Sequence, residues 1–384
     1  MKLKRKKLKL GPKKFIPVNA PLITKSDSLN LYKTAKSGWV SSSGKCISDF
    51  EIKFAKFIGT NYATTVSSGT AALEISIKAL GIKKNDEVII PNFTIISNAI
   101  AVIKQNAKPI FVDCNKIDWN MNINKIIKSI NKRTKAIIAT HIYNFPLEIQ
   151  KLKRICKRKK IYLIEDAAEV LGSKINNKNC GSFGDISIFS FYANKHITTG
   201  EGGMITSNSL KLINKCKSLK NLSFGKIDRF HHEDIGWNYR LTNLQASLGL
   251  SQLSRIKKII SQKQSVGSYY YKLLKNNKNI YIPPPKMKSL TNIYWVVGIV
   301  LKKNLKISAK KFSKKLLKYK IETRPFFWPM NKQKILIKMG LINKKQIFPN
   351  SEHISKYGLY LPSGISLAKK QIRDICDVIN YLTD

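Results

Sequence analysis

Acidic side chains are scarce in this chain of 384 residues: 22 Asp and Glu stand against 70 Lys and Arg, which gives a formal net charge of +48. Such an excess makes nucleic acid a partner to consider. The lysines, however, are spread through every segment together with many Asn and Ile residues. Only residues 1–14 form a true basic block, which we interpret as a disordered arm. The even spread argues against nucleic-acid binding as the main function.

Long apolar runs are also missing. No stretch approaches the roughly 18 residues that a membrane span needs, and the N-terminus lacks the apolar core of a secretory signal. The six cysteines are scattered, with no CxxC pair and no metal-ligand spacing. His231 and His232 are adjacent, but no third ligand lies at a suitable spacing. We therefore expect a cytoplasmic protein with reduced cysteines, no membrane segment and no metal site.

Glycine-rich nucleotide fingerprints are absent, since neither GxGxxG nor GxxxxGK[ST] occurs. From Tyr62 onward, apolar strands alternate with amphipathic helices, which indicates an α/β fold with a mostly parallel sheet. A long helical pattern after residue 240 and the PPP at 283–285 mark a change of organisation. We predict a large domain with an N-terminal lead-in over residues 15–250, and a linking helix with a smaller C-terminal α/β domain over residues 251–384.

Three polar groups follow apolar strands. SSGTAAL, residues 67–73, opens a helix, and its hydroxyls and helix N-terminus suit a phosphate as well as they suit simple N-capping. IYLIEDAAE supplies Glu165 and Asp166, and a buried carboxylate needs a cationic partner such as a pyridinium nitrogen or a lysine. Lys195 ends the run ISIFSFYANK, where a desolvated amine can attack a carbonyl carbon, although most lysines of this chain must be solvated surface.

These three groups share one expected location. Ligands of parallel α/β sheets bind beyond the carboxyl ends of the strands, where all three groups arise. A phosphate cradle, an aspartate for a pyridine nitrogen and a reactive lysine are the needs of one cofactor, pyridoxal 5'-phosphate (PLP). The residues alone therefore predict PLP chemistry, with N-capping, a salt bridge and a surface lysine as the alternative readings.

Five segments occur in an order that carries a resemblance: SSGTAAL, EDAAE, GDISIFSFYANKHITTGEGGM, GWNYRLTNLQASLGLSQL and ETRPFFWP. Together they resemble the DegT/StrS-type sugar-nucleotide aminotransferases over nearly the whole chain from residue 15, and most closely the GDP-perosamine synthase branch. The resemblance implies a type I PLP aminotransferase fold, a homodimer with shared active sites and L-glutamate as amino donor. Sugar 3-dehydratases of the same fold carry histidine in place of the reactive lysine, so Lys195 argues against that activity.

The resemblance also assigns cofactor contacts. Lys195 is the catalytic residue, which binds the cofactor covalently and later moves a proton. Asp166 pairs with the pyridine nitrogen, and Glu169 lies near the phenolic oxygen or contacts the substrate. The phosphate is held by Gly69, Thr70 and Ser190, with Asn238 reaching in from the other subunit. Relatives usually place an aromatic residue over the pyridine ring where this chain has Ile95, and either Ile95 or Phe93 packs there.

Substrate contacts are predicted more broadly. His141 and Tyr143 of THIYNF end a strand in the same layer, and their alternative is a hydrogen-bonded structural role. Arg229, His231 and Arg324 are candidates for a nucleotide diphosphate. The implied reaction moves the amino group of L-glutamate to the C4 ketone of a nucleotide-linked 4-keto-6-deoxyhexose. GDP-perosamine is the first choice of product, UDP- or dTDP-viosamine the second, and a 3-keto sugar aminotransferase is a further alternative, because nothing in the chain reads the base.

Overall fold

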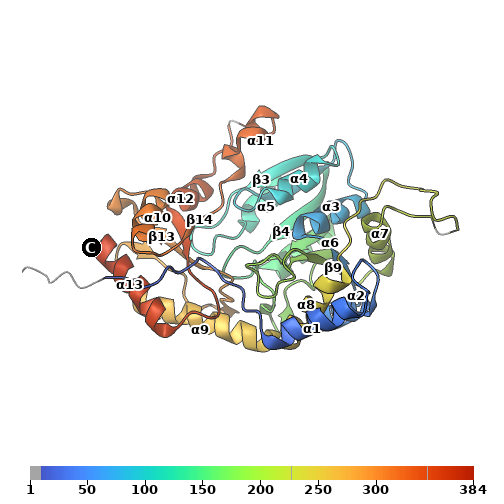
Figure 1. Cartoon of the computed structure of the whole chain (residues 1–384). Coiled ribbons are helices and arrows are strands. Elements are labelled where there is room, and N and C mark those ends of the chain that lie inside the picture. The colour runs from blue at the N-terminus through green and yellow to red at the C-terminus, as the bar shows by residue number, and fades with distance from the viewer. Residues whose placement is uncertain (1–9, 226, 344) are drawn as a thin grey trace, which may run out of the picture.

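The computed structural model describes residues 10–225, 227–343 and 345–384, which form two packed units (Figure 1). The larger unit is built on a seven-stranded sheet of order β1-β9-β8-β5-β4-β2-β3. Strand β9 runs antiparallel to both neighbours, and the other pairs are parallel. The strands are β1 (Tyr62–Val66), β2 (Glu87–Pro91), β3 (Lys108–Val112), β4 (Thr134–Thr140), β5 (Tyr162–Asp166), β8 (Ile186–Ser190) and β9 (Gly203–Ser207).

Helices cover both faces of this sheet, as expected for strands that are buried throughout. One face carries α3 (Gly69–Ala79), α4 (Ser97–Ile103) and α7 (Leu210–Lys220). The other carries α2 (Lys45–Ile58), α5 (Ile123–Ser129), α6 (Ile149–Lys159) and α8 (Asn243–Ser254), and α1 (Lys25–Lys36) lies outside against α8. The side chains on the two faces form two separate apolar clusters.

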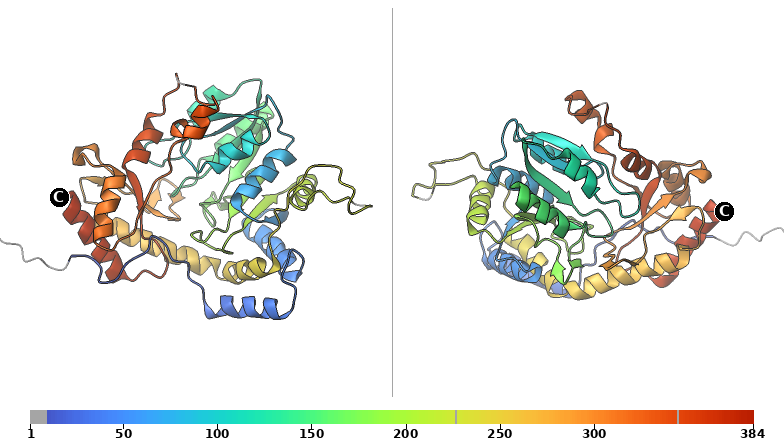
Figure 2. Two further views of the ribbon diagram at one scale, coloured as in Figure 1. Left: turned by 45° about the horizontal axis from the view of Figure 1, so that its top comes forward. Right: turned by 180° about the vertical axis from the view of Figure 1, so that it is seen from behind.

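The C-terminal unit is a small antiparallel sheet of order β10-β13-β15-β14 packed with helices (Figure 2). Its strands are β10 (Ile280–Tyr281), β13 (Val297–Leu301), β14 (Arg324–Pro325) and β15 (Gly358–Leu361). Its helices are α10 (Ala309–Lys318), α12 (Pro349–Tyr357) and α13 (Lys369–Thr383), with the 3-10 turn η1 (Lys303–Leu305). The turn η2 (Met330–Lys332) and helix α11 (Lys334–Lys338) place Met330 and Leu336 in an apolar cluster of the larger unit. Two short hairpins pair β6 (Lys174–Ile175) with β7 (Lys178–Asn179), and β11 (Lys286–Met287) with β12 (Leu290–Thr291).

Helix α9 (Ile256–Leu274) runs beneath both units (Figure 1). Ile256 and Ile259 pack into the core of the larger unit, whereas Tyr270 and Leu274 pack into the core of the smaller one. The long helical pattern of the sequence is in fact two helices, because the chain breaks at Arg255. At this break, the guanidinium of Arg255 binds the carboxylate of Asp27 and the carbonyl of Leu22.

The N-terminal segment lies partly in the smaller unit. Ile16 pairs with Ile321 and is buried in the C-terminal core, although the sequence predicts residues 15–60 as a lead-in to the large domain. Residues 10–14 were expected to belong to a disordered arm, yet Pro12 is buried and the carbonyl of Lys13 accepts a hydrogen bond from Lys320 Nζ at 3.0 Å. The rest of that arm, residues 1–9, lies outside the described residues. The boundary at residue 250 stays a prediction.

The sequence predicts that this chain has no membrane segment. Among the residues that the structure describes, no helix is both long enough and apolar enough to span a bilayer.

Candidate active site

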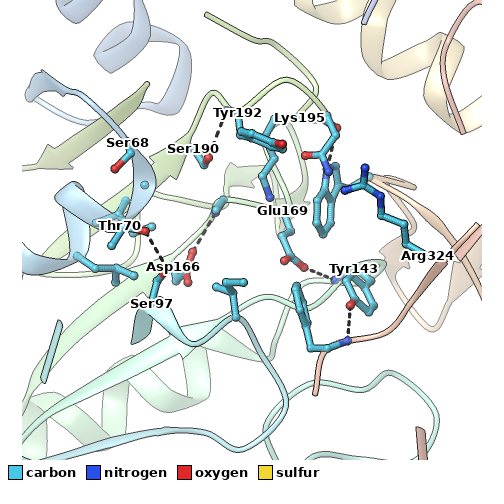
Figure 3. Close-up of a pocket in the computed structure, with 18 of the residues that line it drawn as sticks. Ser68, Thr70, Ser97, Tyr143, Asp166, Glu169, Ser190, Tyr192, Lys195 and Arg324 are labelled. Carbon is cyan, nitrogen blue, oxygen red and sulfur yellow. Dashed lines mark hydrogen bonds between the residues drawn. The ribbon is translucent and has the colours of Figure 1, made fainter. Parts of the chain in front are cut away.

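A cavity of about 540 Å³ opens at the carboxyl edge of the large sheet, where it meets the smaller unit (Figure 3). Parallel strands end at one edge, so residues far apart in sequence converge there. The lining comes from the start of α3, the ends of β5 and β8, the β8–β9 loop, β14 and the segment before β13. Among the residues predicted to form the site, it contains Gly69, Thr70, Ile95, Tyr143, Asp166, Glu169, Ser190, Lys195 and Arg324.

The N-terminus of α3 provides hydroxyl and N–H groups on one side of the cavity. Ser68 caps the helix by accepting the N–H of Ala71 at 3.0 Å, and the first N–H groups of a helix have no partner within it. Thr70 Oγ1 lies 2.8 Å from Ser97 Oγ. A Cβ on Gly69 would lie 3.0 Å from Ser190 Cβ, so glycine is what lets β8 end this close to the helix. Helix dipole, free N–H groups and hydroxyls together suit a phosphate.

Asp166 ends β5 and is buried at the floor of the cavity. Its Oδ2 accepts hydrogen bonds from Asn98 Nδ2 at 3.3 Å and Thr140 Oγ1 at 3.4 Å, and its Oδ1 accepts the N–H of Ala168 at 3.2 Å. Burial raises the pKa of this carboxyl, while the Ala168 N–H and the charge of Lys195 act in the opposite direction. A cationic ring nitrogen would relieve the cost of holding a carboxylate here.

Glu165 points away from the cavity and has a structural role. Its carboxylate accepts the N–H groups of Gly181 at 2.6 Å and Phe183 at 2.8 Å, and it lies 3.0 Å from Nε2 of His141. Burial acts to raise its pKa, but these contacts outweigh burial and lower it. The other ring nitrogen of His141 accepts the N–H of Leu147 at 2.8 Å.

These contacts also describe the surroundings of His141. In the described part of the chain, His141, Glu165 and Cys180 place potential ligand atoms within 4.8 Å of one another. The side chains of His141 and Glu165 are already engaged with each other and with backbone N–H groups, so this cluster is a hydrogen-bonded core and not a metal centre. Its buried position does not support the predicted substrate contact at His141 and fits the structural alternative.

Lys195 lies in the loop between β8 and β9 and points toward the space between Asp166 and Glu169 (Figure 3). Its Nζ sits 3.5 Å from the centre of the Trp295 ring. The surrounding protein removes water from the amine and lowers its pKa, against the opposing charges of Glu169 and Asp166. An amine with a lowered pKa is more often neutral, so it can act as a nucleophile or a base. Lys195, beside two carboxyls, is therefore a candidate for the reactive amine of this cavity.

Glu169 completes the charged floor of the cavity. Its Oε2 accepts the N–H of Tyr143 at 2.8 Å, and the side chain is buried. Burial raises the pKa of Glu169 to about 8, although the charge of Lys195 acts to lower it. Near neutral pH this residue therefore holds a proton, and it can donate a hydrogen bond toward the cavity.

The structure distinguishes Ile95 from Phe93. Ile95 lines the cavity and is 46% exposed, whereas Phe93 is fully buried. The Phe93 ring packs at about 6 Å from those of Tyr143 and Phe327 in the aromatic cluster that joins the two units. Of these two residues, Ile95 alone borders the cavity, and its packing on a bound ring stays a prediction.

The remaining predicted residues divide into two groups. Tyr143 lines the cavity with a left-handed backbone (φ 52°), and its hydroxyl accepts the N–H of Phe327 at 3.2 Å. Arg324 is exposed on β14 at the mouth. Arg229, His231 and Asn238 lie outside the cavity of their own chain; the first two are in the exposed loop after α7 that projects from the large unit (Figure 2). That these residues contribute to the active site of the other subunit stays a prediction.

Several lining residues were not predicted from the sequence, namely Ser68, Ser97, Tyr192, Glu201, Trp295 and Tyr360. Ser68 lies within the SSGTAAL motif and Ser97 lies two residues after Ile95, so the hydroxyl groups beside these predicted residues were an available signal. Trp295 and Tyr360 come from the smaller unit. No sequence signal pointed to them, because only the packing of the two units brings them to the cavity.

Comparisons with known proteins agree with this geometry. Residues 21–380 match the model of the DegT/DnrJ/EryC1/StrS aminotransferase family. GDP-perosamine synthase of Vibrio cholerae is 38% identical over 95% of this chain and 99% of its own length, and that of Escherichia coli O157:H7 is 37% identical over 96% and 98%. A putative sugar aminotransferase from Streptococcus pneumoniae, solved in its PLP form, superposes with a TM-score of 0.89 at 21% identity, over 96% of this chain and 98% of that one.

The family match and the structural superposition both cover nearly the whole chain. The type I aminotransferase fold predicted from the sequence is confirmed by this superposition. The chain belongs to the DegT/DnrJ/EryC1/StrS family and is a PLP-dependent aminotransferase.

Proposed function

We propose that this enzyme transfers the amino group of L-glutamate to the C4 ketone of a nucleotide-linked 4-keto-6-deoxyhexose, giving a 4-amino-4,6-dideoxy sugar nucleotide. The observation that carries the proposal is the amine of Lys195, which faces Asp166 and Glu169 in a cavity bordered by a helix N-terminus. Its aminotransferase part follows from the family, and its substrate part is supported by the activity named for the two relatives.

The cavity fits PLP on observations of this chain. The start of α3 with Ser68, Thr70 and Ser190 would hold the phosphate, because a helix N-terminus and these hydroxyl groups meet there among the cavity-lining residues. Asp166 would hold the protonated pyridine nitrogen, and Ile95 would pack on the ring. When bound, PLP supplies an electron sink that stabilises the carbanion left when a proton leaves the substrate carbon.

The proton-carrying groups of the chain are arranged for two half-reactions. Lys195, with its lowered pKa, takes a proton from the carbon of glutamate and later returns one to C4 of the sugar. Glu169, with its raised pKa, stays protonated beside it and would donate a hydrogen bond to the phenolic oxygen of the cofactor or to the substrate. Asn98 and Thr140 hold the Asp166 carboxylate in one orientation throughout.

The mouth of the cavity suits a large anionic substrate. Arg324 is exposed there, and a guanidinium pairs well with a diphosphate or a carboxylate. GDP is our first choice of nucleotide, since both relatives above are named for GDP-perosamine. UDP- or dTDP-viosamine, and amination at C3, are the alternatives that the product assay must separate.

The test is a product assay with the purified full-length chain. The protein is incubated with L-glutamate and GDP-, UDP- or dTDP-linked 4-keto-6-deoxyhexoses in parallel, with a 3-keto sugar nucleotide as a further substrate. We expect a new amino sugar with GDP, identified by mass and by the position of the amine in its NMR spectrum. Turnover of the 3-keto sugar alone would overturn the C4 assignment. A colourless protein that PLP cannot restore, with DNA binding that weakens steeply as salt rises, would overturn the enzyme assignment.

We further propose a homodimer in which the loop containing Arg229 and His231, together with Asn238, completes the site of the other subunit. The exposure of Ile227, Phe230 and Ile235 on this projecting loop supports the idea, because isolated apolar tips of this kind favour contact with protein. Mixed dimers test it directly. Lys195→Ala and Asn238→Ala chains should each be inactive and should regain part of the activity when mixed, whereas no regain would show that each chain completes its own site.

A further inference from the structure

Trp295 is the feature of the cavity that neither the motifs nor the proposed chemistry explains. It belongs to the smaller unit, directly before β13, yet its ring lies against the side chain of Lys195 in the larger unit. The distance of 3.5 Å from Nζ to the ring centre is that of a cation lying on the face of an indole. A tryptophan at this place therefore contacts the amine on which the reaction depends.

Two further contacts fix the orientation of the ring, and a third holds the backbone of the same residue. The indole Nε1–H donates to the carbonyl of Asn194 at 2.9 Å, which is the residue before Lys195. The carbonyl of Trp295 itself accepts a hydrogen bond from the buried Lys263 at 3.0 Å. The Tyr143 ring packs beside the indole, with 5.7 Å between the ring centres. Trp295 thus makes two contacts at Lys195: its N–H binds the carbonyl of the preceding residue, Asn194, and its ring lies against the Lys195 amine.

The second point acts on the charge of the lysine. The face of an indole is the most favourable aromatic surface for a cation, and the attraction grows where water is excluded. Other charged or titratable groups act on the same amine: Asp166 and Glu169 from the end of β5 and beyond, and His196 from the same loop. The charges of Asp166 and, once it is ionised, of Glu169 stabilise the ammonium form. His196 holds no charge near neutral pH because burial lowers its pKa to about 3, and the indole adds a further stabilising contact.

Position also matters when the cofactor is engaged with substrate. During that part of the cycle the Lys195 amine must be free, close to the reacting carbon and ready to carry a proton. The lysine side chain has four rotatable bonds, so an unsupported amine would sample many positions. Its effective concentration at the reacting carbon would then be lower. A flat, fixed surface on one side of the amine removes much of this freedom.

We propose that Trp295 is a positioning residue for Lys195, whose indole face holds the free amine and whose N–H fixes the turn from which the lysine projects. The proposal rests on the proposed function above, in which Lys195 carries the proton. It also means that the smaller unit takes part in the chemical step by a contact with the lysine, in addition to any contact with substrate.

Two substitutions separate the two contacts. Trp295→Phe keeps an aromatic face but has no N–H for the carbonyl of Asn194. Trp295→Leu removes both the face and the N–H. Trp39→Leu is the matched control, because Trp39 is exposed in the loop after α1 and does not line the cavity.

The test measures Lys195 itself in the full-length chain without cofactor. Trace acetylation with acetic anhydride over a range of pH, followed by mass spectrometry of the Lys195 peptide, gives the pKa of this one amine. We expect Trp295→Leu to lower that pKa by about 1, Trp295→Phe to lower it less, and Trp39→Leu to leave it unchanged. In the loaded enzyme the acidic limb of the pH profile of kcat should move in the same order, with KM nearly constant.

The outcomes are distinct. An unchanged titration of Lys195 in Trp295→Leu, with near-wild-type circular dichroism and Tm, would overturn the proposal. If Trp295→Leu does not fold, equal pKa and equal acetylation rates in Trp295→Phe and wild type would overturn it. Failure of the proposed function appears elsewhere, as borohydride trapping the cofactor on a peptide other than that of Lys195, and leaves the titration result interpretable.

Discussion

Replacing Glu169 by Gln should stabilise the folded chain, and more so as the pH rises. The side chain is buried, and its pKa lies at about 8 in the fold against an ordinary value of 4.5. Each pKa unit corresponds to about 1.36 kcal/mol of free energy, which sets a limit of about 5 kcal/mol for the whole difference. Because Lys195 titrates with Glu169, we expect about half of this limit in practice. Gln keeps the oxygen that accepts the N–H of Tyr143.

The sign follows from proton binding. Between pH 4.5 and about 8 the unfolded chain has an ionised Glu169, while the folded chain keeps the proton. Unfolding therefore releases a proton in this window, and the free energy of unfolding falls as the pH rises. Gln does not titrate, so the gain of Glu169→Gln over wild type should be small at pH 5 and should reach on the order of 2–3 kcal/mol at pH 8.5. The assay is urea denaturation of the cofactor-free chains at both values, at equal protein concentration.

Glu201→Gln is the matched control. Glu201 lines the same cavity but is exposed, so its charge stays hydrated in the folded chain. We expect its effect on the denaturation midpoint to be small and equal at both pH values. If Glu169→Gln gives the same difference from wild type at pH 5 and pH 8.5, the argument that burial holds a proton on Glu169 is refuted.

Three further predictions concern the cavity and its support. Lys195→Ala should abolish the borohydride-reducible cofactor adduct and lower kcat by a factor of at least about 10²; retained turnover would identify another lysine. Gly69→Ala should weaken PLP binding by roughly tenfold, measured by fluorescence titration, because the new Cβ would lie 3.0 Å from Ser190 Cβ; an unchanged Kd would show that β8 can move away. Glu165→Leu should lower the free energy of unfolding by roughly 3 kcal/mol, since it orphans the buried N–H groups of Gly181 and Phe183; Glu148→Leu at the start of α6, whose side chain makes no capping hydrogen bond, is its comparison.

The sheet and the convergence of the site were predictable because they depend on local signals. Apolar strands that alternate with helices indicate parallel pairing, and parallel strands place their carboxyl ends at one edge. Asp166, Lys195 and the start of α3 were therefore expected to meet, and the structure brings them to one cavity. The same local reasoning missed the break at Arg255, where α8 ends and α9 begins within one continuous helical pattern and the guanidinium binds the distant Asp27.

What could not be predicted depends on tertiary packing. The sequence shows that one of Glu165 and Asp166 must be buried, but both are, on opposite sides of β5. His141 and Tyr143 look alike in sequence, two residues apart at a strand end, yet one pairs with Glu165 and the other turns into the cavity through a left-handed backbone. The contribution of Trp295 depends on how the smaller unit docks, and no motif encodes that contact.

The hairpin of β8 and β9 has a consequence for how the gene can change. Ser190 and Gly203 face each other across the two strands, and the intervening loop is tied down where the N–H of Thr198 binds Gln252 Oε1 at 2.8 Å. With both ends and the middle anchored, one codon gained or lost between Ser190 and Thr198 would displace Lys195 from the cavity without touching the sheet. Insertions and deletions in natural relatives should therefore be purged from residues 191–197.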